Sequence, residues 1–497
     1  MKLPVKNIIV CLGAILFLPG TCLLQAQQSN TFYLMHDVPQ SNLLNPAVQI
    51  HCKTYVGIPA LAAAHVSYSN TAFTYNDLAG SDAWNLEGVF DQMHRTDLYA
   101  VEAMWVPVAL GYRRKSLYFT FNIAERVHGF QTVPRDLAEL AVHGNGPFIG
   151  ETARYNGFRP GAYHIREYSL GVSKKMGPYL TAGIRAKLLF GKANLSTGRS
   201  QMDLTTNDNN FGLVLETDYR LNTSFPYTLT LDADGNISGF ELGEIDPVHY
   251  LLNRKNPGFS VDLGIIYRYS EKITLSASLL DLGIVRWRST LNNIHGVGEY
   301  SYTGADLTAE LISGAFIDEA IDSVMSSLEV STTQDPYSYM LPTQLFLAGS
   351  YRYNEKISFG LVNRNVIYRA KVHSSFTLSA QADLTDRFLG TLSWSYLNNS
   401  IFNVGLGMAY HGKGFQVHAV TDNLIGFFYP FDTRTLNLRF GVNLMLGCPR
   451  NKKERLEEAA YSNLPKGGEC PYPENPERTR KKRIRDVRKI QRQFRFN

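Results

Sequence analysis

The chain has 497 residues, of which 19% are charged and 12% are aromatic, with 28 tyrosines. A mean hydropathy of −0.17 excludes a membrane protein built from apolar helices, whereas many aromatics at modest hydropathy are typical of a transmembrane β-barrel. The net charge of +5 comes from residues 478–497, where ten Lys/Arg against one Asp give +9, so the rest of the chain carries 5 − 9 = −4. This balance excludes a basic, nucleic-acid-binding body.

The N-terminus is predicted to be a signal peptide, residues 1–26. Lys2 and Lys6 precede an apolar run from Ile8 to Leu24, and small residues allow cleavage after Ala26. An uncleaved anchor and a lipoprotein signal at Cys22 are the weaker alternatives. No later stretch approaches the ~20 apolar residues of a spanning helix, so any membrane must be crossed by strands. We expect residues 27–61 to form a plug or lead-in segment.

Period-two alternation indicates β-strands along the mature chain. In Thr435–Leu446, for example, six apolar side chains alternate with polar ones, and Ser116–Ile123 repeats the pattern. The strands run to ten or more residues, which favours a membrane barrel over a soluble sandwich with strands of ~5–6. Strands are predicted near 62–75, 98–112, 116–130, 162–174, 179–194, 258–269, 272–287, 343–353, 356–367, 372–384, 388–398, 401–411, 414–425 and 434–446.

Short and long connections alternate between these strands. Short polar turns, such as Tyr353–Lys356, are followed by long connections such as Gln131–Gly161 and Ser289–Thr343. Outer-membrane barrels show this asymmetry, with short turns in the periplasm and long loops outside. The fold class predicted is all-β, a transmembrane antiparallel β-barrel of about fourteen strands over residues 62–446. Helices are expected in long loops at Asp82–His94 and Ala305–Leu328, and the count becomes sixteen if Phe211–Leu221 and Thr228–Phe240 join the wall.

After Leu446 the alternation stops, and residues 447–497 are predicted to be a basic periplasmic tail. Three cysteines remain in the mature chain, and an exported protein meets an oxidising compartment. A bond between Cys448 and Cys470 is favoured because the loop between them is short. Two other possibilities remain. One is a bond between Cys52 and Cys448, which would join the two strands at the barrel seam, and the other is three free thiols.

Several short motifs resemble known barrel families. Asn45-Pro46-Ala47 is similar to the element near the start of FadL-type fatty-acid channels and PorV-type secretion barrels, and Asp262-Leu-Gly264 and Asp281-Leu-Gly283 resemble their strand motifs. The overall pattern resembles an uncharacterised family of Bacteroidota outer-membrane barrels. The resemblance implies a fourteen-strand barrel plugged by an N-terminal hatch and passing hydrophobic molecules. A hatch from Gln27 to His51 would be small, and no aromatic residue closes the last strand.

Two acidic residues are unusual for their setting. Asp262 and Asp281 lie in apolar strands, and a carboxylate in a barrel wall must point inward to avoid lipid. We expect a lumen polar network in which they pair with Arg185, Arg268 or Arg352, either rigidifying the barrel or gating a substrate. Three strand tryptophans are expected in the aromatic belts at the membrane interfaces: Trp105, Trp287 and Trp394.

No motif indicates catalysis. The twelve histidines show no metal-ligand spacing, and Asp232–Asn236 is better explained as a β-turn than as a calcium loop. We therefore predict no enzyme activity, no cofactor and no metal.

The predicted function is a structural or accessory component of an envelope or secretion complex in the outer membrane. The alternative is a FadL-like channel for hydrophobic or amphipathic small molecules. The partners expected are outer-membrane lipid, a periplasmic or secretion-complex protein bound through the basic tail, and in the alternative a hydrophobic ligand, but no nucleic acid.

Overall fold

A computed structural model describes residues 2–4, 29–79, 86–231, 237–243, 246–302, 329–368, 371–397 and 400–448. The predicted signal peptide, the helix expected at Ala305–Leu328, the turn at Asp232–Asn236 and the basic tail lie wholly or almost wholly outside these residues. None of the described helices is long and apolar enough to cross a membrane.

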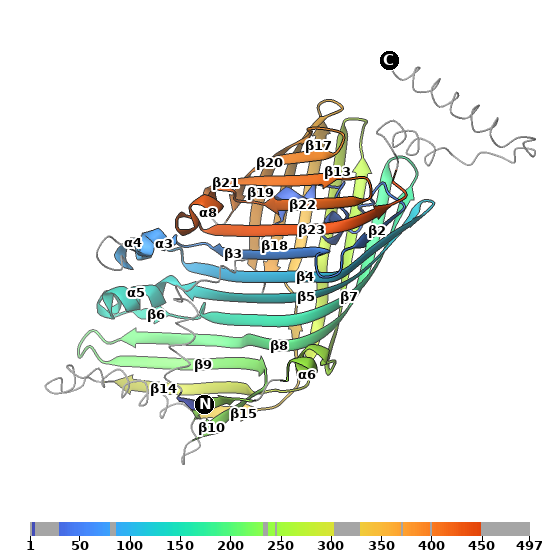
Figure 1. Ribbon diagram of the computed structural model, residues 1–497. Helices are drawn as coiled ribbons and strands as arrows, with labels where there is room; N and C mark the ends of the chain where they lie inside the picture. Colours follow the sequence, from blue (N-terminus) through green and yellow to red (C-terminus); the bar gives the residue numbers. More distant parts are fainter. Residues whose placement is uncertain are drawn as a thin grey trace, which may run out of the picture.

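Within the described residues, the strands form a closed antiparallel barrel of 14 strands (Figure 1). The first wall strand is broken in two, β2 and β3, and another consists of β16 and β17. The last strand pairs with both halves of the first, so that Thr54 lies opposite Leu446 and Phe440 opposite Ala64. The wall consists of β2 (Thr54–Gly57), β3 (Ala63–Asn70), β4 (Thr96–Arg114), β5 (Leu117–Pro134), β7 (Arg159–Met176), β8 (Leu180–Thr206), β12 (Asn256–Arg268), β13 (Ile273–Trp287), β16 (Tyr337–Met340), β17 (Thr343–Arg352), β18 (Ile357–Tyr368), β19 (Lys371–Asp383), β20 (Phe388–Leu397), β21 (Ser400–His411), β22 (Phe415–Thr421) and β23 (Thr435–Leu446).

The predicted count of fourteen is confirmed, but the wall begins earlier than expected. The first strand predicted from period-two alternation starts at residue 62, whereas in the structure β2 already pairs with β23 and β4 from Thr54. Four strand residues are too few to show alternation clearly, and residues 58–62 interrupt the strand.

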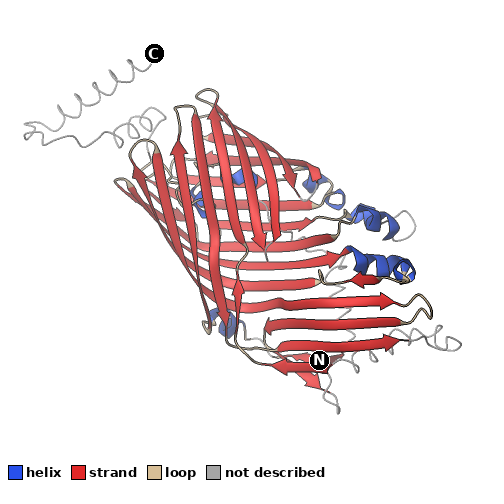
Figure 2. Ribbon diagram, turned by 180° about the vertical axis from the view of Figure 1, so that it is seen from behind, coloured by secondary structure: helices blue, strands red, loops and turns tan. Residues whose placement is uncertain are grey.

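Phe211–Leu221 and the described part of Thr228–Phe240, the two segments that would have raised the strand count to sixteen, lie outside the wall. The outer half of β8 runs beyond the barrel and pairs with β9, and β9 pairs with β14, which gives a projecting sheet (Figure 2). The strands outside the wall are β6 (Thr152–Arg154), β9 (Leu213–Ser224), β14 (Asn293–Tyr302) and β15 (Glu329–Thr333), and a separate small sheet of β1 (Lys2–Pro4), β10 (Tyr227–Leu231) and β11 (Ile237–Leu242).

Short helices occupy the long connections and the lumen. The helix expected at Asp82–His94 is present as α4 (Leu86–Gln92). Figure 1 shows α3, α4 and α5 together at the end of the barrel opposite the short turns. The helices are α2 (Asn30–Tyr33), η1 (Pro39–Leu43), α3 (Tyr75–Leu78), α4, α5 (Arg135–His143), η2 (Gly146–Phe148), α6 (Pro247–Leu252), α8 (Ile425–Phe428) and η3 (Pro430–Asp432).

The two faces of the wall differ sharply in chemistry. On β12, for example, the outward Phe259 and Leu263 are apolar and exposed, while the alternating inward Ser260 and Asp262 are polar and buried. This is the reverse of a soluble protein, whose apolar face is the buried one. Trp105 and Trp394 point outward with nearly half of their surface exposed, and their place in an aromatic belt stays a prediction.

Trp287 was predicted to face the membrane, and this is wrong. It is fully buried and stacks on Tyr337 inside the barrel. A bulge in β13 is the reason: Asp281 adopts φ +62°, and the β12–β13 register shifts between Val261 and Leu263. One extra residue moves every later side chain of a strand to the opposite face.

Candidate functional site: the plugged lumen

Residues 29–51 fill the lumen as a plug. Phe32 stacks on His418 and Tyr33 stacks on Phe346, with ring centroids 5.3 and 4.7 Å apart. Both aromatic rings of the plug are fully buried. The described part of the predicted hatch, residues 29–51, is small, as expected, but it suffices to occupy the centre of the barrel.

Polar contacts attach the plug to several strands. The Asn30 amide donates to hydroxyls on β19, and the Thr31 and Ser393 hydroxyl oxygens are 2.6 Å apart. Gln40 of the plug and Asn443 of β23 exchange amide hydrogen bonds. Each bond contributes only about 1 kcal/mol, so the plug is held by many weak, separable contacts.

The Asn45-Pro46-Ala47 element sits in a notch formed by two glycines. Gly183 and Gly264 face each other on β8 and β12. A Cβ atom at Gly264 would lie 2.2 Å from the Asn45 side-chain oxygen, and one at Gly183 would lie 2.3 Å from the Pro46 carbonyl oxygen. Only glycine allows this close approach of plug and wall.

Beside the plug, the inward faces of β5, β7, β8, β12 and β13 carry a belt of ion pairs. Asp262 accepts from Arg185 Nε at 2.8 Å, from Lys187 Nζ at 3.0 Å and from the backbone N–H of Asp281 at 2.8 Å. The last bond uses a backbone donor at the bulge, where regular ladder pairing is interrupted.

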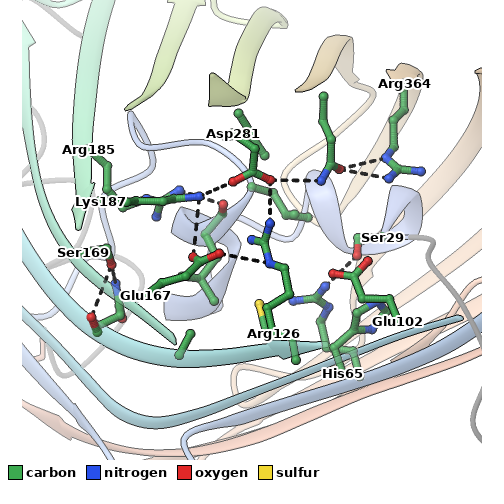
Figure 3. A pocket seen from close by; sticks show the side chains of 18 residues that line it. Ser29, His65, Glu102, Arg126, Glu167, Ser169, Arg185, Lys187, Asp281 and Arg364 are labelled. Atoms are coloured by element: carbon green, nitrogen blue, oxygen red, sulfur yellow. Dashed lines mark hydrogen bonds and ion pairs between the residues drawn. The ribbon is translucent and has the colours of Figure 1, made fainter. Parts of the chain in front are cut away.

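Asp281 is the centre of this belt. Lys187 Nζ lies 2.5 Å and Arg126 Nη1 2.8 Å from its two carboxylate oxygens, and Gln344 donates to it at 3.3 Å. Glu167 pairs with Arg126 Nε at 3.2 Å. Figure 3 shows Arg126 and Lys187 converging on Asp281 from different strands.

Arg185 joins the belt to the plug. Its guanidinium donates to the backbone carbonyls of Asn42 and Leu43 at 3.0 and 2.7 Å while its Nε holds Asp262. The side chain is almost completely buried. The position of the plug is therefore coupled to the charged wall.

The structure places the predicted network residues in two different regions. Asp262, Asp281 and Arg185 are brought together, but Arg268 and Arg352 are not part of the belt. Arg268 is six residues farther along β12 than Asp262, which is roughly 20 Å in an extended strand. Arg268 and Arg352 instead line a cavity at the short-turn end.

Sequence reasoning missed most of the belt. Arg126 and Glu167 lie in phase with the polar faces of β5 and β7, so continuing the alternation beyond Ile123 would have found Arg126. Lys187 likewise shares the inward face of β8 with Arg185. Other buried polar residues around the same lumen are His65, Glu102, Gln344, Arg364 and Arg439.

The space left among these groups is small. The cavity bounded by the belt and the plug holds about 50 Å³, which is room for a few water molecules and for no organic ligand. The described plug and wall side chains thus leave little free space at this level of the lumen.

A disulfide closes the barrel seam next to this site. Cys52 is bonded to Cys448, so the favoured pairing of Cys448 with Cys470 is wrong. The register explains the result: Thr54 pairs with Leu446 across the seam, which brings the cysteines two residues beyond each into opposition. Cys470 lies outside the described residues.

A family of unknown function (DUF5723) has a model that matches residues 46–422, more than half of the chain. No curated protein matches the sequence. Among solved structures, the toluene transporter TbuX of Ralstonia pickettii is 10% identical, with a TM-score of 0.37 over 82% of this chain and 94% of that chain.

Two further solved structures are similar at the same level. A Pseudomonas aeruginosa FadL homologue is 10% identical, with a TM-score of 0.34 over 82% of this chain and 94% of its own. The toluene transporter TodX of P. putida is 10% identical, with a TM-score of 0.33 over 80% and 90%. At these values the likeness gives no basis for assigning their substrates to this chain.

Proposed function

We propose that this chain, which belongs to the DUF5723 family of unknown function, is an outer-membrane channel whose lumen is closed by a removable N-terminal plug. The apolar outward face fits a lipid environment. The alternation of short turns and long connections fits an outer-membrane barrel with its short turns in the periplasm.

The plug is the single observation that carries this proposal. It is one continuous segment held by side-chain contacts, and it seats in a glycine notch rather than in the strand ladder. A segment held in this way can leave without unpairing any wall strand. A short hatch and a long tail, as predicted from the sequence, favour a scaffold. In the structure, however, residues 29–51 occupy the lumen, and the tail lies outside the described residues.

The substrates we propose are amphipathic small molecules rather than purely hydrophobic ones. With the plug displaced, Arg126, Glu167, Lys187 and Asp281 would still line one side of the lumen, because all four belong to the wall. A hydrophobic molecule that displaced water from this belt would leave charges poorly solvated, at a cost of several kcal/mol. A molecule with a polar group would keep them hydrogen-bonded.

The first experiment locks the plug. In a Cys470→Ser background, Thr31→Cys and Ser393→Cys replace two hydroxyls that are 2.6 Å apart. Full-length protein is reconstituted into liposomes that contain carboxyfluorescein. We expect the oxidised lock to release dye at least tenfold more slowly than wild type and to recover on reduction. The single cysteine variants, treated with the same reductant, are the controls.

The second experiment loosens the plug. Gly264→Ala forces a Cβ atom against Asn45, whereas Gly129→Ala adds one where nothing lies within 4 Å. We expect Gly264→Ala alone to accelerate dye release severalfold. Equal release by the locked, loosened and wild-type proteins would refute the channel.

A scaffold for an envelope complex remains the second candidate. The observation in its favour is that the ion-pair belt belongs to the wall and would rigidify the barrel with or without the plug. Capture of partners from native membranes tests it. A deletion strain that loses uptake of an amphipathic compound while its envelope complexes remain intact would eliminate it.

A further inference from the structure

A second, larger cavity opens at the short-turn end of the barrel. It has a volume of about 300 Å³ and lies between the plug and the β7–β8 turn, with Gly177, Pro178 and Tyr179 in its wall. We call this cavity the vestibule. Its volume is ample for a small organic ligand, in contrast to the closed space beside the belt.

Three cationic side chains line the vestibule from three separate strands: Lys175 on β7, Arg268 on β12 and Arg352 on β17. Among the described residues, none of the three forms an ion pair. Asp37 is the vestibule's one acidic lining residue, and its carboxylate lies 3.8 Å from the His51 ring.

The cations of the belt differ from those of the vestibule, because each belt cation is paired with a carboxylate. There, Arg126, Arg185 and Lys187 each contact at least one carboxylate within 3.2 Å. The vestibule instead gathers cations without matching carboxylates. Like charges facing one cavity repel, and a bound anion removes that repulsion.

Neutral donors complete the lining. Thr181, Thr274, Ser350 and Ser358 contribute hydroxyls to the vestibule. Hydroxyl groups donate readily to carboxylate and phosphate oxygens.

We propose that the vestibule is a binding site for a small polyanion, with Arg268 and Arg352 as the principal ligands. Guanidinium groups bind carboxylate and phosphate oxygens in pairs, and Lys175 adds a point charge from a third strand. The plug forms the inner wall of the site, so the ligand is a small molecule rather than a long chain. The site goes beyond the proposed channel, because binding does not require the plug to move.

The test is a binding measurement on full-length protein in neutral detergent at low salt. Pyrophosphate and citrate, which represent the phosphate and carboxylate sources, are titrated by calorimetry. We expect the double variant Arg268→Gln/Arg352→Gln to bind the preferred probe at least tenfold more weakly than wild type. Arg268→Lys should retain part of the affinity because it keeps the charge.

Lys356→Gln/Lys413→Gln is the matched control. It removes the same charge from short turns that do not line the vestibule. Its affinity should equal that of wild type, and the heat-modifiable gel mobility of all variants should show folded barrels. Failure of wild type to bind either probe, or equal weakening in the control double variant, would overturn the proposal. This measurement does not use dye release, so the binding site can be confirmed even if the dye-release experiments reject the channel.

Discussion

At the scale of single residues, the backbone conformation of Asp281 decides which side chains of β13 face the lumen. Its left-handed φ of +62° creates the bulge that turns both its own side chain and Trp287 inward. Asparagine and aspartate tolerate this region better than most residues, which explains an acid at this place in an apolar strand. The carboxylate then collects Lys187 and Arg126, which lie on different strands.

Replacing that carboxylate should destabilise the barrel. Asp281→Asn leaves the bulge possible but places Lys187 and Arg126 side by side without the shared charge, and breaking a buried ion pair costs about 3–5 kcal/mol. Urea unfolding in liposomes, followed by tryptophan fluorescence, measures the free energy of unfolding. Glu271→Gln in an exposed turn is the control and should change it by less than about 0.5 kcal/mol. Equal stability of the two variants would show that the belt does not stabilise the fold.

At the scale of elements, one end of the seam is formed by the short strand β2 and closed by a covalent bond, while β3 forms the rest. β2 supplies only four residues to the ladder between β23 and β4. The Cys52–Cys448 bond spans a sequence separation of 396 residues, for which the chain-entropy model gives on the order of 5 kcal/mol as an upper estimate. The bond therefore reinforces the end of the seam at which the short strand β2 pairs with β23.

Removal of this bond should weaken the seam specifically. We expect Cys52→Ser to lower resistance to thermal unfolding in detergent, whereas Cys470→Ser should not change it. Non-reducing peptide mapping should recover one linked pair that contains Cys52 and Cys448. A linked pair of Cys448 and Cys470, or three free thiols, would contradict the seam bond.

At the scale of the whole molecule, the barrel has two unlike ends. Short turns, the seam disulfide and the cationic vestibule gather at one end, and the helices of the long connections and the projecting sheet lie toward the other (Figure 1). An outer-membrane barrel presents its short turns to the periplasm. The vestibule would then face the periplasm.

Labelling of intact cells tests this orientation. A cysteine at Glu299, exposed on β14, should react with an impermeant maleimide from outside. A cysteine at Asn354, in a short turn, should react only after the outer membrane is permeabilised. Labelling of Asn354→Cys but not Glu299→Cys in intact cells would invert the assignment.

The number of strands and the inward orientation of Asp262 could be read from the amino-acid sequence because alternation is local. A side chain's face depends only on its distance along one strand, so Asp262 could be assigned to the lumen without knowledge of its partners. The long connections could be recognised in the same way, and the segment Phe211–Leu221 could be kept out of the wall.

Tertiary structure alone decided what depends on two distant segments. The bulge at Asp281 and the pairing of Cys52 with Cys448 follow from register between strands, and a slip of one residue would reverse every face. The plug's fit into the Gly183–Gly264 notch is of the same kind, because a glycine's need for space appears only when the opposing backbone is in place. Local alternation thus determined the strands of the barrel wall. Register between distant segments determined which side chains and which part of the plug meet in the lumen.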